Sequence, residues 1–269
     1  MKLVLARPLT VHCHDPEPAV WSATAIGAGP PPADTVDVWY ATLDQMRPLL
    51  SAYTALLDPV EVERADRFRF EPDRERFILG HGLLRTVLMG YVGGDGRSIR
   101  YARGPFGKPS LDPKEVHFNF SDTKDAFLIG VSRSIDLGVD IETMTRNVDH
   151  EAVSEHYFTG PEITAIRNAG GHSKRRFLEF WTRKEAVLKA SGVGIMDDLR
   201  VLRVDAPTNT MIIDHESFTQ MAAPEYRVRT WHIGADHIVS IALPSDLKAF
   251  RMIRINSALT PPPRSGRGS

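Results

Sequence analysis

Apolar and polar positions along the chain predict short strands separated by helices. Strand-like patterns occur at residues 38–41, 126–131, 137–140 and 237–242. The first and third of these segments each open a region with helical periodicity, and the second and fourth close those regions. We therefore expect two halves that each run strand, helices, then strands, which is an α+β arrangement.

A weak internal repeat supports this division. The residues RFIL at 76–79 are echoed by RFLE at 176–179, and VL at 87–88 is echoed by VL at 187–188. Chance matching of short apolar helices is the alternative, but the common order of the features favours a duplicated α+β unit. Two similar halves packed face to face leave a cleft between them, and ligands commonly bind in clefts between domains.

The two ends of the chain differ from the middle. Proline and glycine are dense in residues 14–35 and 258–269, and such segments do not build a core. The expected division is an N-terminal extension that is partly loose, an N-terminal α+β half, a C-terminal α+β half that carries the candidate metal site, and a disordered tail (residues 1–35, 36–136, 137–255 and 256–269).

Composition narrows the function classes. The 269 residues are 42% hydrophobic and 25% charged with a net charge of −1, which is typical of a globular protein and argues against general nucleic-acid binding. No apolar run approaches the roughly 20 residues of a membrane span. Cys13 is the only cysteine, so no internal disulfide forms and a cytoplasmic location is expected.

Two carboxylates share one face of the strand at 138–142. Side chains alternate along a strand, so Asp140 and Glu142 point to the same side. Like charges at this spacing repel unless a cation neutralises them, and carboxylate oxygens are the ligands that Mg²⁺ prefers. The alternative is a half-exposed strand with a solvated acidic face, which is the more common situation for this pattern taken alone.

The segment 173–191 predicts a helix with a lysine in its apolar stripe. At about 3.6 residues per turn, Lys184 falls in line with Phe177 and Trp181. An ammonium among aromatic rings is costly unless it reaches water or a partner. A lysine that extends its charged end to solvent is the alternative interpretation.

Glu185 lies at the edge of the same stripe, and Lys189 follows it at the i+4 position. The pair alone is equally consistent with a routine surface contact. In combination, one segment offers a pair of acids and the other an acid flanked by lysines. Together they are suited to hold a metal ion and a pyrophosphate.

Four short motifs follow one another along the chain: GKP at 107–109, FNFS at 118–121, GVDIE at 138–142 and FWTRKEAVLKASG at 180–192. Their order and spacing resemble those of Sfp-type 4′-phosphopantetheinyl transferases over residues 38–243. The resemblance implies a pseudo-dimer of two α+β halves with coenzyme A in the cleft. It also implies Mg²⁺-dependent transfer of 4′-phosphopantetheine from coenzyme A to a serine hydroxyl of an apo carrier protein, with release of 3′,5′-ADP.

The resemblance further implies roles for individual residues. The metal ligands are Asp140, Glu142 and Glu185. The catalytic residues are Glu185, Lys189 and Glu162. Glu185, acting directly or through a metal-bound water, is the first choice of base, and Glu162 is the second. The residues expected to bind coenzyme A are Arg64, Arg67, Arg76, Lys108, Ser121, Asp122, Lys184 and Lys189, with Arg76 and Lys108 at its 3′-phosphate end.

One position departs from the family pattern. Asp122 follows Ser121 where the family usually has histidine. Histidine donates hydrogen bonds to a phosphate, whereas an ionised aspartate only accepts them. Asp122 must therefore point away, pair with a basic residue or merely shape a turn. We expect weaker discrimination between coenzyme A and its form that lacks the 3′-phosphate.

The residues taken alone also permit two other functions. The acidic residues alone also permit a Mg²⁺-dependent nucleotide phosphohydrolase, and the change at Asp122 permits a non-catalytic protein that binds coenzyme A or a carrier protein. The expected partners are coenzyme A and an acyl, polyketide or peptidyl carrier, with neither a nucleic acid nor a membrane. An internal duplication favours a monomer.

Overall fold

The computed structural model describes residues 6–22, 29–194, 198–244 and 249–255. These residues form a mixed fold with several sheets and helices, which confirms the α+β class that the sequence predicts. The expected disordered tail at 256–269 lies outside the described residues. No helix in the described part of the chain is long and apolar enough to cross a membrane.

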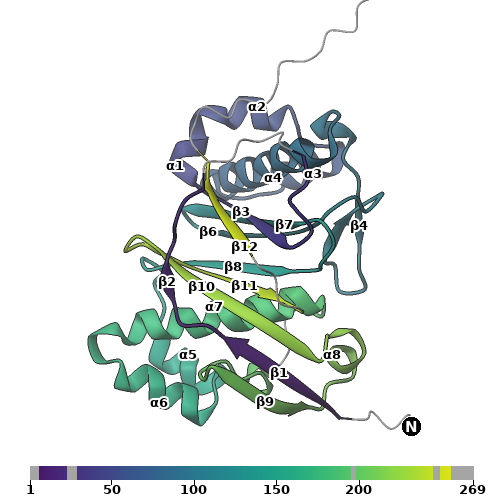
Figure 1. Cartoon of the computed structure of the whole chain (residues 1–269). Helices are drawn as coiled ribbons and strands as arrows, with labels where there is room; N and C mark the ends of the chain where they lie inside the picture. The colour runs from purple at the N-terminus through teal and green to yellow at the C-terminus, as the bar shows by residue number, and fades with distance from the viewer. Residues whose placement is uncertain (1–5, 23–28, 195–197, 245–248, 256–269) are drawn as a thin grey trace, which may run out of the picture.

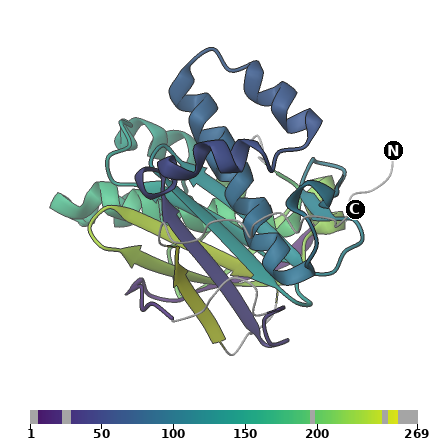
Figure 2. The same ribbon diagram turned by 90° about the horizontal axis from the view of Figure 1, so that it is seen from above.

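The first sheet has four strands in the order β12-β3-β7-β6, with β12 parallel to β3 and the other pairs antiparallel. Its strands are β3 (Thr35–Thr42), β6 (His117–Thr123), β7 (Ala126–Ser132) and β12 (Ala249–Arg254). Figure 2 shows the blue helices of residues 43–92 above this sheet. They are α1 (Leu43–Met46), α2 (Leu50–Thr54), α3 (Pro59–Asp66) and α4 (Glu71–Val92).

The second sheet has the order β8-β11-β10-β1-β9, and β2 pairs with β10. Its strands are β1 (Arg7–Cys13), β2 (Glu17–Pro18), β8 (Gly138–Thr143), β9 (Thr208–Ile213), β10 (Glu225–Ile233) and β11 (His237–Leu243). Helix α7 packs on β8, β11 and β10 (Figure 1). The helices of this half are α5 (His150–Tyr157), α6 (Gly160–Asn168), α7 (Ser173–Ser191) and α8 (Glu216–Met221).

Smaller elements complete the described fold. The strands β4 (Tyr101–Arg103) and β5 (Pro109–Leu111) form a separate hairpin. Short 3-10 helices are η1 (Arg47–Leu49), η2 (Gly96–Ser98), η3 (Gly170–His172) and η4 (Leu199–Val201).

Helix α7 has the predicted bounds, and two glycines fix its position. Gly192 ends the helix with φ +78°, a conformation that L side chains rarely adopt. Gly138 of β8 lies directly against the helix, because a Cβ on it would stand 2.0 Å from the carbonyl oxygen of Ala186. The lack of a side chain at Gly138 therefore allows α7 and β8 to approach closely, which brings the acidic strand beside the second half of the helix.

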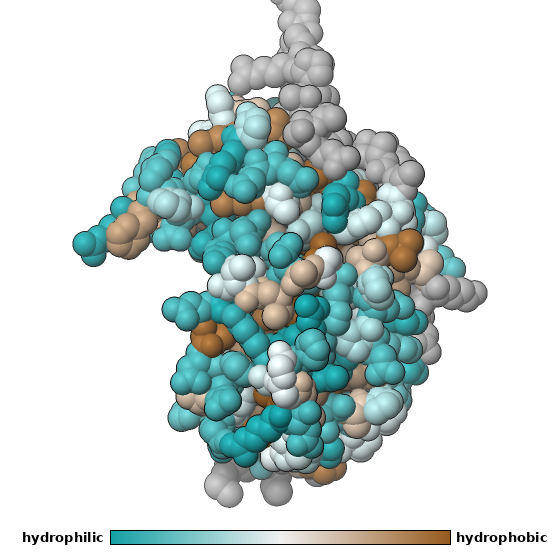
Figure 3. All heavy atoms as spheres, turned by 90° about the vertical axis from the view of Figure 1, so that its left-hand side faces the viewer, coloured by the Kyte–Doolittle hydropathy of each residue, from teal (hydrophilic) through white to brown (hydrophobic). Residues whose placement is uncertain are grey.

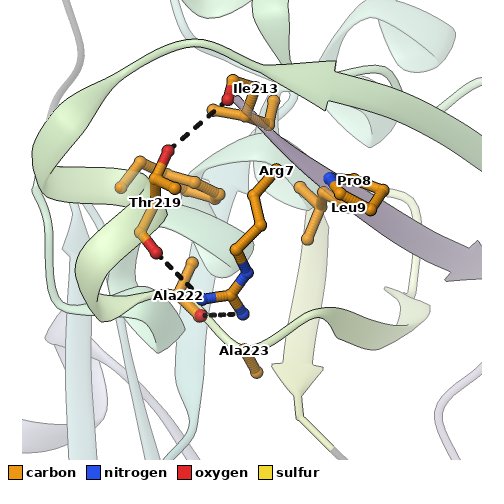
Figure 4. A pocket seen from close by; sticks show the side chains of 8 residues that line it. Arg7, Pro8, Leu9, Ile213, Thr219, Ala222 and Ala223 are labelled. Atoms are coloured by element: carbon orange, nitrogen blue, oxygen red, sulfur yellow. Dashed lines mark hydrogen bonds between the residues drawn. The ribbon is translucent and has the colours of Figure 1, made fainter. Parts of the chain in front are cut away.

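Each terminal strand belongs to the sheet of the other half. β1 lies between β10 and β9 in the second sheet, and β12 pairs with β3 in the first. This differs from the expected division, in which residues 1–35 were an extension that is partly loose. The reason is the alternation in β1, which buries Leu9, Val11 and Cys13. Arg7 anchors the strand by donating to the carbonyls of Thr219 and Ala222 at the end of α8 (Figure 4).

The two sheets meet through their edge strands and a shared core. β6 is one edge of the first sheet, β8 is one edge of the second, and the two strands pack against each other. The side chain of Asn119 on β6 accepts a hydrogen bond of 2.8 Å from the backbone N–H of Val139 on β8. A continuous apolar cluster includes Val38 and Leu128 from one sheet together with Val239 from the other. The junction between the sheets is therefore packed and defined.

Candidate active site

Three elements place polar side chains at the junction of the sheets. Asp140 comes from β8, Lys189 from α7 and Ser121 from β6. The ammonium of Lys189 lies 2.6 Å from Oδ1 of Asp140 and 2.9 Å from Oγ of Ser121. Ser121 in turn donates to the same carboxylate oxygen at 3.0 Å. The structure thus joins residues from three of the four sequence motifs in one contact.

The two glutamates of the predicted metal site lie beside Asp140. Burial, followed by the negative charge of Asp140, raises the pKa of both Glu142 and Glu185 to about 7. Arg146 forms an ion pair with Glu142, which lowers that pKa in part. The negative charge of Asp140 therefore acts on both glutamates.

The residues of this cluster fit a hard divalent cation. Oδ2 of Asp140 is buried and accepts no hydrogen bond from any residue that the structure describes. Asp140, Glu142 and Glu185 supply carboxylate oxygens, the ligands that Mg²⁺ prefers. As the side chains stand, no group of three or more Asp, Glu, His or Cys residues in the described ranges is placed to hold a metal ion. Asp140 and Glu142 are turned toward Lys189 and Arg146.

Asp122 is paired with a basic residue, which is one of the outcomes that the sequence allowed. Its Oδ2 lies 3.0 Å from Nε of Arg76, and both line a pocket of about 240 Å³ together with Arg64 and His81. Burial raises the pKa of Asp122, and the charges of Arg76 and Lys189 oppose this shift. The positive charge of Arg76, the arginine that contacts Asp122 in this pocket, is therefore already neutralised by an ion pair.

The other predicted contacts to coenzyme A are dispersed. Lys108 lines a separate pocket, where its ammonium donates to the carbonyls of Leu137 (3.0 Å) and Ala190 (3.3 Å). Lys108 and Arg76 therefore lie in different pockets, at the two ends of β6. Arg67 is exposed on α3 and pairs with Glu63. The structure does not bring these basic side chains to one point.

Lys184 and Glu162 form a fully buried ion pair. Their side chains are 1% and 0% exposed, and the ammonium lies 2.9 Å from Oε2 of Glu162. The lysine also donates to the carbonyls of Tyr157 and Leu199. Glu162 accepts from the N–H groups of Val204 and of Thr159, its partner in a capping box. All of these bonds lie within the second half, so the pair ties α6 and α7 together and is not open to a substrate.

Arg146 is the site residue that sequence reasoning missed. Its guanidinium pairs with Glu142 and lies 5.1 Å from the ring centroid of Trp181. The signal available in the sequence was an arginine four residues after the second acid of GVDIE. Residues four apart are neighbours in a helix, but Glu142 lies at the end of a strand, where this spacing does not predict contact. The pair forms because the chain turns after β8, and the sequence alone does not give that turn.

Comparisons with known proteins place the chain in a family. Residues 136–242 match the sequence model of the 4′-phosphopantetheinyl transferase superfamily. The chain is 33% identical to the 4′-phosphopantetheinyl transferase HetI of a Nostoc strain over 168 residues, which cover 61% of this chain and 71% of HetI. It is 31% identical over 236 residues to a phosphopantetheinyl transferase of a Thraustochytrium strain, covering 79% and 80% of the two chains.

A more distant relative is found in Bacillus subtilis. The chain is 27% identical over 145 residues to the 4′-phosphopantetheinyl transferase Sfp of Bacillus subtilis, covering 53% of this chain and 63% of Sfp. Coverage of 71% of HetI at 33% identity is enough to assign a family. The residues matched by the family model, 136–242, include Asp140, Glu142, Glu185 and Lys189. This chain belongs to the 4′-phosphopantetheinyl transferase superfamily.

Proposed function

We propose that this transferase moves the 4′-phosphopantetheine moiety of coenzyme A to a serine hydroxyl of an apo carrier protein, releases 3′,5′-ADP and depends on Mg²⁺. The observation that carries the proposal is the contact of Lys189 with Asp140 and Ser121, beside Glu142 and Glu185. A diphosphate needs charge neutralisation of this kind, with both acidic metal ligands and a basic side chain in one place.

The proposed substrate site is a cleft between two halves that form a pseudo-dimer. Each half has a sheet crossed by one long helix, α4 in the first and α7 in the second. The molecule is indented between its upper and lower parts in Figure 3. The pockets that hold Arg76 and Lys108 both open along β6, the edge strand at this junction. Coenzyme A lying along β6 would reach both cations even though they do not meet.

Asp140, Glu142 and Glu185 would hold Mg²⁺, which neutralises charge on the diphosphate and on the leaving group. Lys189 would donate to a diphosphate oxygen, and Ser121 would position that ammonium. In the transfer, the serine oxygen of the carrier forms a bond to the β-phosphorus and the bond to the 3′,5′-ADP oxygen breaks.

Glu185 is the proposed base for the serine proton. A carboxyl group with a pKa near 7 combines a useful ionised fraction with proton affinity at neutral pH. Glu162 is the weaker candidate because its carboxylate is fully buried and bonded to Lys184. We propose that Glu162 and Lys184 act instead by fixing α7 against α6.

The positions of the other basic side chains suggest which part of coenzyme A each would contact. Arg64 and Arg76 line the pocket beside Asp122 and would meet the phosphate end of coenzyme A. Arg67 is exposed beyond the lining of that pocket and would assist only after release from Glu63. Relatives are named as transferases of phosphopantetheine, and the carrier of this chain would be an acyl, polyketide or peptidyl carrier. A monomer is proposed because the chain carries two similar halves. A cytoplasmic location is proposed because a single cysteine forms no internal disulfide.

Mass spectrometry tests the proposal directly. Several apo carrier proteins are incubated with coenzyme A, Mg²⁺ and this protein. The expected result is a gain of one phosphopantetheine on at least one carrier, with 3′,5′-ADP formed in equal amount. Release of 3′,5′-ADP without any carrier would indicate a phosphohydrolase, and tight binding of coenzyme A without turnover would indicate a non-catalytic protein. Either outcome contradicts the proposal.

A further inference from the structure

Two basic side chains reach the acidic cluster from its rim. Lys189 and Arg146 are 28% and 33% exposed, whereas the carboxylates that they contact, Asp140 and Glu142, are 8% and 12% exposed. Each cation contacts a different acid. The two carboxylates are therefore buried groups whose charge is balanced by side chains that extend inward from solvent.

Both cations also have a second contact, with a group that is not itself an acid. The ammonium of Lys189 donates to Oγ of Ser121 at 2.9 Å, and Ser121 in turn donates to Asp140. The guanidinium of Arg146 lies 5.1 Å from the ring centroid of Trp181, in the geometry of a cation–π contact. Each side chain would keep a favourable contact if its carboxylate were taken by another cation. Because Lys189 and Arg146 each contact an acid and also a second group, each could give up its carboxylate to a metal ion and keep the other contact.

We propose that Lys189 and Arg146 act as internal counter-ions, which compete with a divalent cation for Asp140 and Glu142 and are released when that cation binds. The inference rests on the proposed function, because it assumes that these acids bind a metal ion. The two side chains carry two positive charges in total, the same charge as a divalent ion. Exchange therefore leaves the acids neutralised and frees two cations at the rim for an anionic substrate.

The opposite role makes a different prediction. If Lys189 and Arg146 were braces that orient Asp140 and Glu142 for the metal, their removal would weaken metal binding, as loss of orienting partners usually does. If they compete, their removal strengthens it. The sign of the change in affinity therefore separates the two roles.

The experiment measures binding of Mn²⁺, a hard divalent probe, to the full chain after chelation and without coenzyme A. Free Mn²⁺ is followed by electron paramagnetic resonance. Lys189→Gln and Arg146→Gln are each expected to bind Mn²⁺ about fivefold more tightly than the unchanged protein, since loss of one competing charge pair is worth on the order of 1 kcal/mol. A thermal melt verifies that each variant is folded.

The control variant is Lys124→Gln. Lys124 is a nearby cation that donates to the carbonyl of Thr145, next to Arg146. No ion pair of Lys124 with an acid of the cluster is found in the described part of the chain. The Lys124→Gln variant therefore reports the general effect on Mn²⁺ affinity of removing a positive charge close to the site. Competition predicts that Lys124→Gln changes Mn²⁺ affinity much less than the other two variants.

The outcomes are distinguishable. Unchanged or weaker binding by Lys189→Gln and Arg146→Gln overturns the inference, and so does equal tightening by Lys124→Gln. If either variant does not fold, Lys189→Met or Arg146→Met replaces it, because methionine keeps much of the aliphatic stem. If the unchanged protein binds Mn²⁺ no better than Asp140→Asn, the metal site of the proposed function fails instead.

Discussion

The ammonium of Lys189 lies 2.6 Å from Oδ1 of Asp140, so the second half of α7 is joined to the edge strand β8 by a charge-assisted hydrogen bond. The contact is possible because Gly138, two residues before Asp140, lets the helix backbone approach the strand. The chemistry proposed for the site therefore depends on a packing feature of the fold. Substitutions in this region should therefore separate residues that act in the chemistry from residues that support the fold.

Asp140→Asn is expected to lower carrier modification by at least about 100-fold, because a carboxylate that neutralises a bound cation is lost. The fold should persist, since the change keeps the side-chain volume and relieves repulsion with Glu142 and Glu185. Transfer of phosphopantetheine is measured by mass spectrometry and the fold by circular dichroism. Asp198→Asn, at an exposed surface pair with Arg200, is the matched control and should keep activity. Full activity in Asp140→Asn would remove it from the site.

Lys184→Met is expected to destabilise the protein by about 3–5 kcal/mol, because it leaves the carboxylate of Glu162 buried without its partner. The double variant Lys184→Met, Glu162→Gln should recover a large part of this loss. Denaturant unfolding measures the free energies.

The same variants test Glu162 as a base. Glu162→Gln should lower the midpoint of unfolding and keep kcat within a few-fold at temperatures where it is folded. A collapse of kcat in a fully folded Glu162→Gln protein would assign the base to Glu162 after all. Exposed Glu155, which pairs with Arg167 on the neighbouring helix α6, provides the control Glu155→Gln, with little effect on either quantity.

Asp122→His is expected to raise the preference for coenzyme A over 3′-dephospho-coenzyme A by about tenfold, the value of one charge-assisted hydrogen bond. The change releases Arg76 from its ion pair and adds a donor in the pocket. The ratio of the two kcat/KM values is measured. Asp122→Asn, which releases Arg76 without adding a cationic donor, should give a smaller increase. A strong preference already present in the unchanged protein contradicts the argument.

Glu61 should contribute to the free energy of unfolding in a way that depends on pH. Burial alone raises its pKa, but hydrogen bonds from His81 and Arg85 outweigh burial and lower it to about 2. A lowered carboxyl pKa stabilises the fold above the unfolded value near 4.5 and loses that contribution as the pH falls through the folded value near 2. The stability difference between the unchanged protein and Glu61→Gln should therefore shrink from pH 5 to pH 2. Chemical denaturation at several pH values checks this, and a constant difference would contradict it.

Local patterns identified the acidic strand and the helix α7. Alternation placed Asp140 and Glu142 on one face, and the helix from 173 to 191 with its stop at Gly192 was found with the correct bounds. These features depend on residues close together in the chain. Motif order then indicated the family, which the comparisons confirm.

Partners distant in the sequence were not predictable in the same way. The apolar stripe correctly marked Lys184 as unusual, but a helical pattern does not say whether an ammonium turns to a substrate or to a buried acid such as Glu162. The pairing of Asp122 with Arg76 was one of several open alternatives until α4 was placed beside β6. β1 directly precedes a segment rich in proline and glycine, and its strand partners β9 and β10 lie about 200 residues later, so no local pattern indicated its place in a sheet.

The exchange of β1 and β12 between sheets has a consequence for synthesis of the protein. β1 is made before the other described strands, yet both of its strand neighbours, β9 and β10, follow it by about 200 residues or more. β12 is the last described strand to be made, and it completes the sheet that begins with β3. The second sheet is complete only after β11 has been made and the first only after β12 has been made, so nascent chains expose open strand edges until then. Fragments cut at the midpoint would each lack a strand, and only their co-expression would restore both sheets.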